Sequence, residues 1–248
     1  MLIIANGAPK SGSTWLFNIV QSIQKFAPIP EGFLLDPSNP NSEIQYDRLS
    51  EFLTTIDHSK QDYLLKNHFG GADQRDAILE ANDTIVLNIK RNTKDAVVSG
   101  YHYTMKLSGE KKTFKSYYWN EGRYLADHIR RYHQTWETKP SSRVLPLSYE
   151  RLKEDPLREI TGIGRFIGLE LSQSDAERVH GETSMEKLRE KYNDDGEAKF
   201  FRKGQAGDWV NYFDPSMLKD IAIIEEMGTN SMPILQNVYA KALAKTTG

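Results

Sequence analysis

The sequence contains no cysteine in its 248 residues. Disulfides, thiolate metal sites and cysteine nucleophiles are therefore excluded. It also has no apolar run approaching the about 20 residues that a membrane-spanning helix needs. Its start, "MLIIANGA", has neither the basic residues nor the apolar length of a secretory leader. These absences predict a protein without a membrane span and with a cytoplasmic location.

An excess of positive charge is also missing. Lysine and arginine number 32 against 34 acidic residues, which gives a formal net charge of −2. A protein with this balance has no overall field that attracts polyanions, so nucleic acid is not an expected partner. If the chain binds an anion, the positive charge must be gathered locally.

The hydrophobic pattern predicts one α/β domain over residues 1–248, because no repeat or low-complexity linker divides the chain. Short apolar runs predict four buried strands, at residues 2–5, 63–68, 84–90 and 143–149. Helices are expected after the first strand, at 73–81, from Asn92 or Thr93, and between 215 and 246. Strands alternating with helices favour a central parallel sheet. Pro146 predicts that the last strand is irregular or lies at an edge.

The stretch "NGAPKSGSTW", residues 6–15, resembles a phosphate-binding loop with a displaced lysine. In nucleotide kinases the pattern G-x-x-x-x-G-K-[ST] puts lysine directly after the second glycine. Here Gly7 and Gly12 have that spacing, but Ser13 follows Gly12 and the lysine is Lys10. Backbone N–H groups running into a helix N-terminus form an anion site. The alternative is an ordinary glycine turn with a helix cap.

Two further segments carry cations in positions suited to phosphate. Arg91 ends an expected strand beside a helix start, where ligands bind in open α/β sheets, and Ser99 follows eight residues later. The sequence "RKG" at 202–204 puts two cations before a glycine whose backbone can be approached closely. Taken singly, each segment is also compatible with a solvated surface.

Lys66 and His68 end another expected strand, in "LLKNHF". A histidine is a general base near neutral pH when it reaches the proton that it removes. One of six histidines taken alone is more often structural.

Together, these segments resemble the PAPS-dependent sulfotransferase family, most closely its cytosolic type. The family pattern P-K-S-G-[ST]-[ST]-W is matched by "PKSGSTW" at residues 9–15. A K-[TN]-H element is matched at 66–68, an arginine with a serine eight residues later by "RNTKDAVVSGYHY", and R-K-G-x-x-G-D-W by "RKGQAGDW". The four motifs occur in the family's order over almost the whole chain.

The resemblance implies a P-loop-NTPase-like three-layer fold, with helices on both faces of the sheet. It also implies 3′-phosphoadenosine 5′-phosphosulfate (PAPS) as sulfuryl donor, with no metal, and in-line transfer to a hydroxyl or amine of a small-molecule acceptor. His68 would be the general base, Lys10 would stabilise the leaving 5′-phosphate, and Lys66 would lie near the sulfuryl oxygens. The implied donor-binding residues are Lys10, Ser11, Gly12, Ser13, Thr14, Trp15, Arg91, Ser99, Tyr149, Thr183, Ser184, Met185, Arg202, Lys203 and Gly204. Met185 stands where the family commonly has an aromatic residue.

The sequence departs from the family at both ends. It begins almost at the first strand, whereas the animal enzymes carry an N-terminal extension that helps enclose the acceptor. The family's C-terminal dimer motif has no counterpart in "WVNYFDPSMLKDIAIIEEM". The resemblance therefore implies neither an acceptor nor an oligomeric state. Residues 27–62 and 101–122 are expected to line the acceptor pocket, although the aromatic residues of the second segment are equally suited to the core.

Two other functions fit part of the pattern. A small-molecule or nucleoside kinase with a degenerate P-loop would leave Arg91, Ser99 and "RKG" without a role, and it would require magnesium. A nucleotide-binding protein without transferase activity would have no use for both Lys10 and His68.

Overall fold

The computed structural model describes residues 1–38, 43–57, 60–193 and 204–227. Within them, four parallel strands form one sheet in the order β2-β1-β3-β4. The strands are β1 (Leu2–Gly7), β2 (Tyr63–Asn67), β3 (Thr84–Lys90) and β4 (Val144–Ser148). All four expected strands are confirmed, and β4, with Pro146, lies at an edge as predicted.

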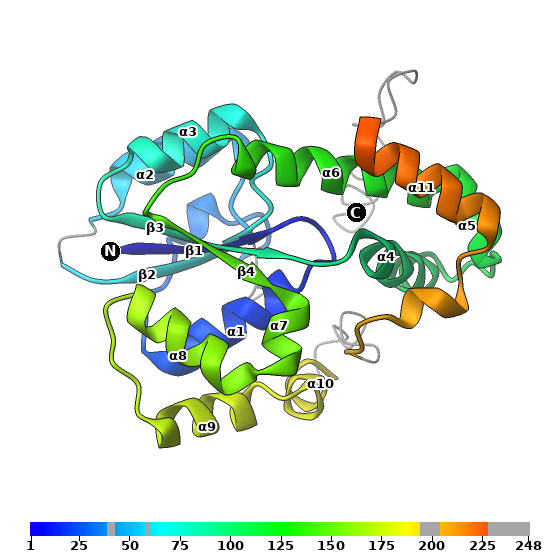
Figure 1. Ribbon diagram of the computed structural model, residues 1–248. Coiled ribbons are helices and arrows are strands. Elements are labelled where there is room, and N and C mark those ends of the chain that lie inside the picture. The colour runs from blue at the N-terminus through cyan, green and yellow to red at the C-terminus, as the bar shows by residue number, and fades with distance from the viewer. Residues whose placement is uncertain (39–42, 58–59, 194–203, 228–248) are drawn as a thin grey trace.

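Helices cover both faces of the sheet, which gives the expected three-layer α/β fold (Figure 1). One face is covered by α1 (Ser13–Ile23), α7 (Tyr149–Glu154), α8 (Pro156–Phe166), α9 (Gln173–Glu182) and α10 (Met185–Asn193). The other face and the C-terminal side of the sheet carry α2 (Leu49–Thr55), α3 (Ala72–Glu80), α4 (Thr93–Ser108), α5 (Phe114–Tyr117), α6 (Arg123–Glu137) and α11 (Pro215–Met227).

The two cores follow from the alternation of side chains along β1. Leu2 and Ile4 belong to the cluster under α2, α4 and α6, whereas Ile3 and Ala5 belong to the cluster under α1 and α8. All four side chains are fully buried, as expected for a central strand with helices on both faces. Such a strand holds the loop that follows it in a fixed position.

The expected helices are largely confirmed. The helix predicted at 73–81 is α3, and Asn92 caps α4 by accepting a hydrogen bond from the Lys94 N–H. Between α1 and α2 the chain forms two short 3-10 turns, Glu31–Phe33 and Tyr46–Arg48. Of the helical tail expected up to residue 246, α11 covers Pro215–Met227 and the remainder lies outside the described residues.

None of the helices that the structure describes is long and apolar enough to cross a membrane.

Candidate active site

The glycine loop joins β1 to the N-terminus of α1, and neighbouring groups pack directly against the backbone of its glycines. Gly12 has φ of 102°, and a Cβ there would lie 2.7 Å from the Tyr149 ring. A Cβ on Gly7 would lie 2.8 Å from the backbone oxygen of Ile89. Lys10 also has a positive φ, 67°. Both glycines are therefore required by geometry, as the spacing predicted.

The start of α1 is suited to an anion. Gly12 provides no side-chain cap, and the first turn contains no acidic residue. The N–H groups of the first turn of a helix have no intrahelical partner, and the helix dipole favours negative charge there. Ser11 is already engaged, because its hydroxyl donates to the Ala8 oxygen at 2.6 Å.

Arg91 joins two distant motifs at this loop. Its Nη1 donates to the backbone oxygen of Lys10 at 3.3 Å, and its Nη2 donates to that of Gln205 at 3.1 Å. The guanidinium stacks on the Tyr149 ring, 4.3 Å from the ring centre. Its Nε is buried without a hydrogen-bond partner among the described residues. The structure therefore brings residue 205, next to the "RKG" motif, to the glycine loop.

The segment after "RKG" is fixed to the first turn of α4. The buried carboxylate of Asp95 accepts the N–H of Gly207 at 2.6 Å and that of Trp209 at 3.1 Å. Of the motif itself, Gly204 is described, with φ of 62°, and a Cβ there would lie 2.6 Å from the Met185 side chain. Met185 and Gly204 thus adjoin. Arg202 and Lys203 lie outside the described residues.

Three of the expected donor-binding residues, Trp15, Tyr149 and Thr183, are buried, and Trp15 contacts the other two. Trp15 packs edge-on against Tyr149, with ring centres 5.5 Å apart, and its Nε1 donates to the Thr183 oxygen at 3.0 Å. The Thr183 hydroxyl donates to Val179, and the Ser184 hydroxyl accepts the N–H of Lys187. Ser99 lies half-buried on α4.

Lys10 and Lys66 place positive charge close to the loop. Burial, and then the nearby Arg91 and Lys66, lower the pKa of Lys10 to about 7. The Lys10 ammonium lies 4.0 Å from the centre of the Tyr103 ring, a cation–π arrangement. Lys66, at the end of β2, is buried and donates to the Glu43 carboxylate at 2.9 Å.

His68 follows β2 and reaches back to the loop. Its Nδ1 lies 2.5 Å from the Gly7 oxygen and its Nε2 lies 3.3 Å from Glu43 Oε1. A carbonyl oxygen only accepts hydrogen bonds, so the neutral ring carries its proton on Nδ1 and leaves Nε2 as the basic nitrogen. Burial lowers the pKa of His68, and Glu43 opposes that change.

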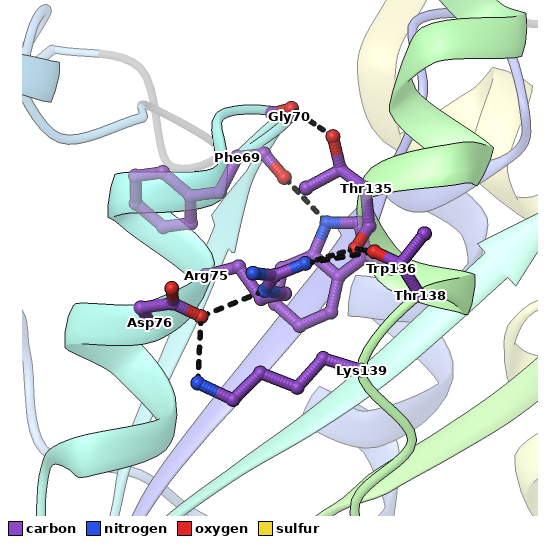
Figure 2. A network of polar contacts seen from close by, with 8 residues as sticks. All are labelled: Phe69, Gly70, Arg75, Asp76, Thr135, Trp136, Thr138 and Lys139. Atoms are coloured by element: carbon purple, nitrogen blue, oxygen red, sulfur yellow. Dashed lines mark hydrogen bonds and ion pairs between the residues drawn. The ribbon is translucent and has the colours of Figure 1, made fainter.

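The loop after His68 is held against α6, as Figure 2 shows. The backbone oxygen of Phe69 accepts the indole N–H of Trp136 at 2.7 Å, and that of Gly70 accepts the Thr135 hydroxyl at 2.9 Å. Arg75 Nη1 donates to the Thr135 oxygen at 2.6 Å. This network fixes the backbone that carries the imidazole.

The aromatic residues after Tyr101 separate into core and site. Phe114, Tyr117 and Tyr118 are buried in the core, whereas Trp119 is 37 % exposed. Tyr103 lies at the Lys10 ammonium.

A hollow of about 580 Å³ lies elsewhere, between β4 and α8, and is lined by side chains such as Leu147, Arg158 and Arg165. No residue of the glycine loop and none of the residues expected at the site line it. Its size therefore gives no argument for catalysis there.

Sequence reasoning missed Glu43 and Asp95. Asp95 sits in the first turn of a helix, where an acidic residue is favoured for any helix. Glu43 lies in a segment without periodicity. Neither position carried a signal that separates it from surface acids.

Residues 2–231 match the family described as the sulfotransferase domain. The chain belongs to this family. It is 30 % identical over 226 residues to sulfotransferase 1A1 of Rattus norvegicus, covering 83 % of this chain and 76 % of that protein. It is 29 % identical over 244 residues to a flavonol sulfotransferase-like protein of Flaveria bidentis, covering 86 % and 77 %.

Solved structures agree on the fold. The mouse sulfotransferase SULT7A1 complexed with PAP superposes with a TM-score of 0.70 at 21 % identity, covering 99 % of this chain and 88 % of that one. Retinol dehydratase in complex with androsterone and PAP gives 0.62 at 18 % identity, covering 94 % and 81 %. The P-loop-like fold and the family expected from the sequence are therefore confirmed.

Proposed function

We propose that this sulfotransferase moves the sulfuryl group of PAPS to a hydroxyl or amine of a small-molecule acceptor by in-line displacement. The observation that carries the proposal is the Arg91 guanidinium, which joins the glycine loop to the segment after "RKG". One nucleotide with phosphates at both ends of its adenosine would span these two segments. The PAP complexes of SULT7A1 and retinol dehydratase support this choice of donor.

The residues present fit such a donor. The α1 N-terminus leaves its first N–H groups for an anion, and the buried Nε of Arg91 is an additional donor. When bound, PAPS supplies the sulfuryl group and a leaving phosphate. Residues 10–14 would bind the 5′-phosphosulfate, while Arg91, Ser99, Arg202, Lys203 and Gly204 would bind the 3′-phosphate. Trp15, Tyr149, Thr183, Ser184 and Met185 would surround the adenine.

The proposed chemistry needs one base and concentrated positive charge. His68 Nε2 would take the proton of the acceptor group, and Gly7 holds the ring in the tautomer that leaves this nitrogen basic. Lys10 would stabilise the charge that develops on the departing phosphate, and Lys66 would lie at the sulfuryl oxygens. Such stabilisation is strong here because the site is largely buried.

Substitution of the base tests this function. His68→Ala should leave PAP binding measurable by calorimetry while turnover falls about 10²–10⁴-fold, the usual contribution of a general base. Lys10→Ala should also leave binding measurable and should lower turnover by about 10²–10³-fold, because the departing phosphate loses its charge stabilisation. Acceptors are found by screening alcohols, phenols, amines and sugars with sulfur-labelled PAPS. Near-normal turnover of His68→Ala would refute the assignment of the base.

Metal dependence separates this function from a kinase. We expect sulfuryl transfer to continue in excess EDTA, whereas phosphoryl transfer from ATP requires magnesium. Magnesium-dependent consumption of ATP would favour the degenerate-P-loop kinase. PAP binding without any turnover would favour a pure binding protein.

The proposal also includes the domain organisation, the cellular location and the partners of the protein. We propose one sulfotransferase domain over residues 1–248 in the cytoplasm, and no nucleic-acid partner.

A further inference from the structure

A carboxylate lies against both candidate catalytic side chains at the end of β2. Glu43 Oε1 is 2.9 Å from Lys66 Nζ and 3.3 Å from His68 Nε2. The three side chains are between 8 % and 20 % exposed, so these charges interact with little screening by water. None of the four sequence motifs includes Glu43.

The segment that carries Glu43 is held in place from several sides. The N–H of Ile44 donates to Asn67 Oδ1 at 2.9 Å, and Ile44 forms a bridge with Leu34. The Tyr46 hydroxyl donates to the second oxygen of Glu43, Oε2, at 3.1 Å. Oε1 is therefore presented to Lys66 and His68 by contacts that do not depend on either of them.

The contact between Glu43 and His68 depends on a proton. With the neutral ring protonated on Nδ1 by its contact with Gly7, Nε2 lies 3.3 Å from a carboxylate oxygen, and both groups are acceptors. Once Nε2 takes up a proton, the same pair becomes an imidazolium beside a carboxylate, and the two charges attract. The arrangement thus favours the protonated ring, which is the state that follows removal of the acceptor's proton.

The groups around His68 act in both directions. Burial, Lys66 and Lys10 lower the pKa of His68, whereas Glu43 and the contact with the Gly7 oxygen raise it. From α6, His128 and Tyr132 face the same region, and Tyr46 faces it from the Glu43 segment. Lys66 and His68 in turn hold the pKa of Glu43 at about 2 against the effect of burial, so this carboxylate is ionised at any working pH.

We propose that Glu43 is a positioning residue that stabilises the His68 imidazolium formed during transfer and fixes Lys66 beside it. This inference rests on the proposed function. In the step, the acceptor's proton passes to His68 Nε2 as the acceptor's electron pair forms the bond to sulfur. The bond from sulfur to the bridging oxygen breaks, and its electron pair stays on the 5′-phosphate. The positive charge of the imidazolium then lies beside the Glu43 carboxylate, which stabilises it until solvent removes the proton.

The coupling is tested first without substrate. Nitrogen-15 NMR of the imidazoles, followed over pH, reports the pKa and tautomer of His68 in wild type and in Glu43→Gln. We expect the His68 pKa to fall by about one unit in Glu43→Gln, because a single opposite charge within 4–6 Å shifts a pKa by about that much. Asp47→Asn is the matched control: it removes the same charge from an exposed position of the same segment. An unchanged His68 pKa in Glu43→Gln would overturn the proposal.

Kinetics then test the role in turnover. In Glu43→Gln, the acid limb of the kcat/KM profile should move to lower pH, and its plateau should fall about ten-fold or more, a part of what a general base contributes. The KM for PAPS should change little. Glu43→Asp keeps the charge with a shorter reach, should recover part of both effects, and replaces Glu43→Gln if that variant does not fold. A wild-type protein without transferase activity would overturn the proposed function, whereas wild-type kcat in both variants of an active enzyme would overturn the role of Glu43 alone.

Discussion

Arg91 and Gln205 are 114 positions apart in the chain, yet the guanidinium of one donates to the backbone oxygen of the other at 3.1 Å. The same guanidinium reaches the Lys10 oxygen through its other terminal nitrogen. The planar fork of arginine suits this double role, which a lysine ammonium on a flexible stem does not reproduce. Arg91 thus links the two segments that are proposed to bind opposite ends of one nucleotide.

Arg91→Lys should weaken the link between these two segments and, with it, the binding of PAP. The lysine keeps the charge but loses the fork and the stacking on Tyr149, so the dissociation constant for PAP should rise at least ten-fold. Titration calorimetry measures it. Arg151→Lys, at an exposed arginine of α7, is the control and should bind PAP like wild type. Equal affinity in Arg91→Lys and wild type would contradict the proposed phosphate contact.

Asp95→Asn should loosen the segment that follows Gly204. An asparagine side chain has a single accepting oxygen, so one of the N–H groups of Gly207 and Trp209 would lose its partner. Loss of one hydrogen bond from a partly buried N–H should lower the free energy of unfolding by about 0.5–1.5 kcal/mol, which urea denaturation measures.

Asp73→Asn is the control for that measurement, because Asp73 also lies in a first helical turn but is exposed. It should change the free energy of unfolding little. PAP affinity should fall in Asp95→Asn alone. A loss of stability with unchanged PAP affinity would show that residues 207–209 do not help to form the site.

The strands, the glycine loop and the start of α4 could be predicted because each depends on a sequence pattern of only a few residues. The apolar runs, the Gly7 and Gly12 spacing and the Asn92 cap each depend on a few consecutive residues. Pro146 indicated an edge strand because proline lacks the N–H that a central strand needs.

Asp95 and Glu43 were not predicted because they contact residues that are far from them along the sequence. Asp95 contacts Gly207, and Glu43 contacts Lys66 and His68, through a fold that no short window contains. At the sequence level, both resemble the many acidic residues that are solvated. Their partners become evident only when the carboxyl ends of the strands are brought together.

Lys10 should make PAP binding take up protons. Its pKa of about 7 in the empty protein means that near pH 8 the side chain is mostly neutral, and a bound anion favours its charged form. Affinity for PAP should therefore fall as pH rises above 7. Calorimetry at pH 8 in buffers of different ionisation enthalpy measures the proton uptake, which should be lost in Lys10→Met.

The sign for stability follows from the same lowering of the pKa. Between about pH 7 and the ordinary lysine pKa of 10.5, the unfolded chain binds the proton and the folded one does not. The contribution of Lys10 to the free energy of unfolding should thus rise with pH across this window. A contribution that falls across it in wild type relative to Lys10→Met would contradict the lowered pKa.

Trp136→Phe should affect turnover through the backbone next to His68. The substitution keeps an aromatic ring but removes the N–H that Phe69 accepts, so a buried carbonyl loses its best partner. We expect about 1–3 kcal/mol less stability and a lower kcat, with PAP affinity unchanged. Trp119→Phe, at the 37 % exposed tryptophan, is the control for the stability measurement. Wild-type kcat in a destabilised Trp136→Phe would show that the network supports the fold alone.

Asn6 lies in register with Asn67 on one side and with Asn88 on the other, so three buried amides mark the same level of three neighbouring strands. Lys66 and His68 are the residues directly before and after Asn67, so the register at Asn67 determines where both side chains lie. Deleting a single residue from β2 would move the apolar side chain of Phe69 into the place of His68, the proposed base. The positions of the proposed catalytic side chains therefore depend on strand register as well as on residue identity.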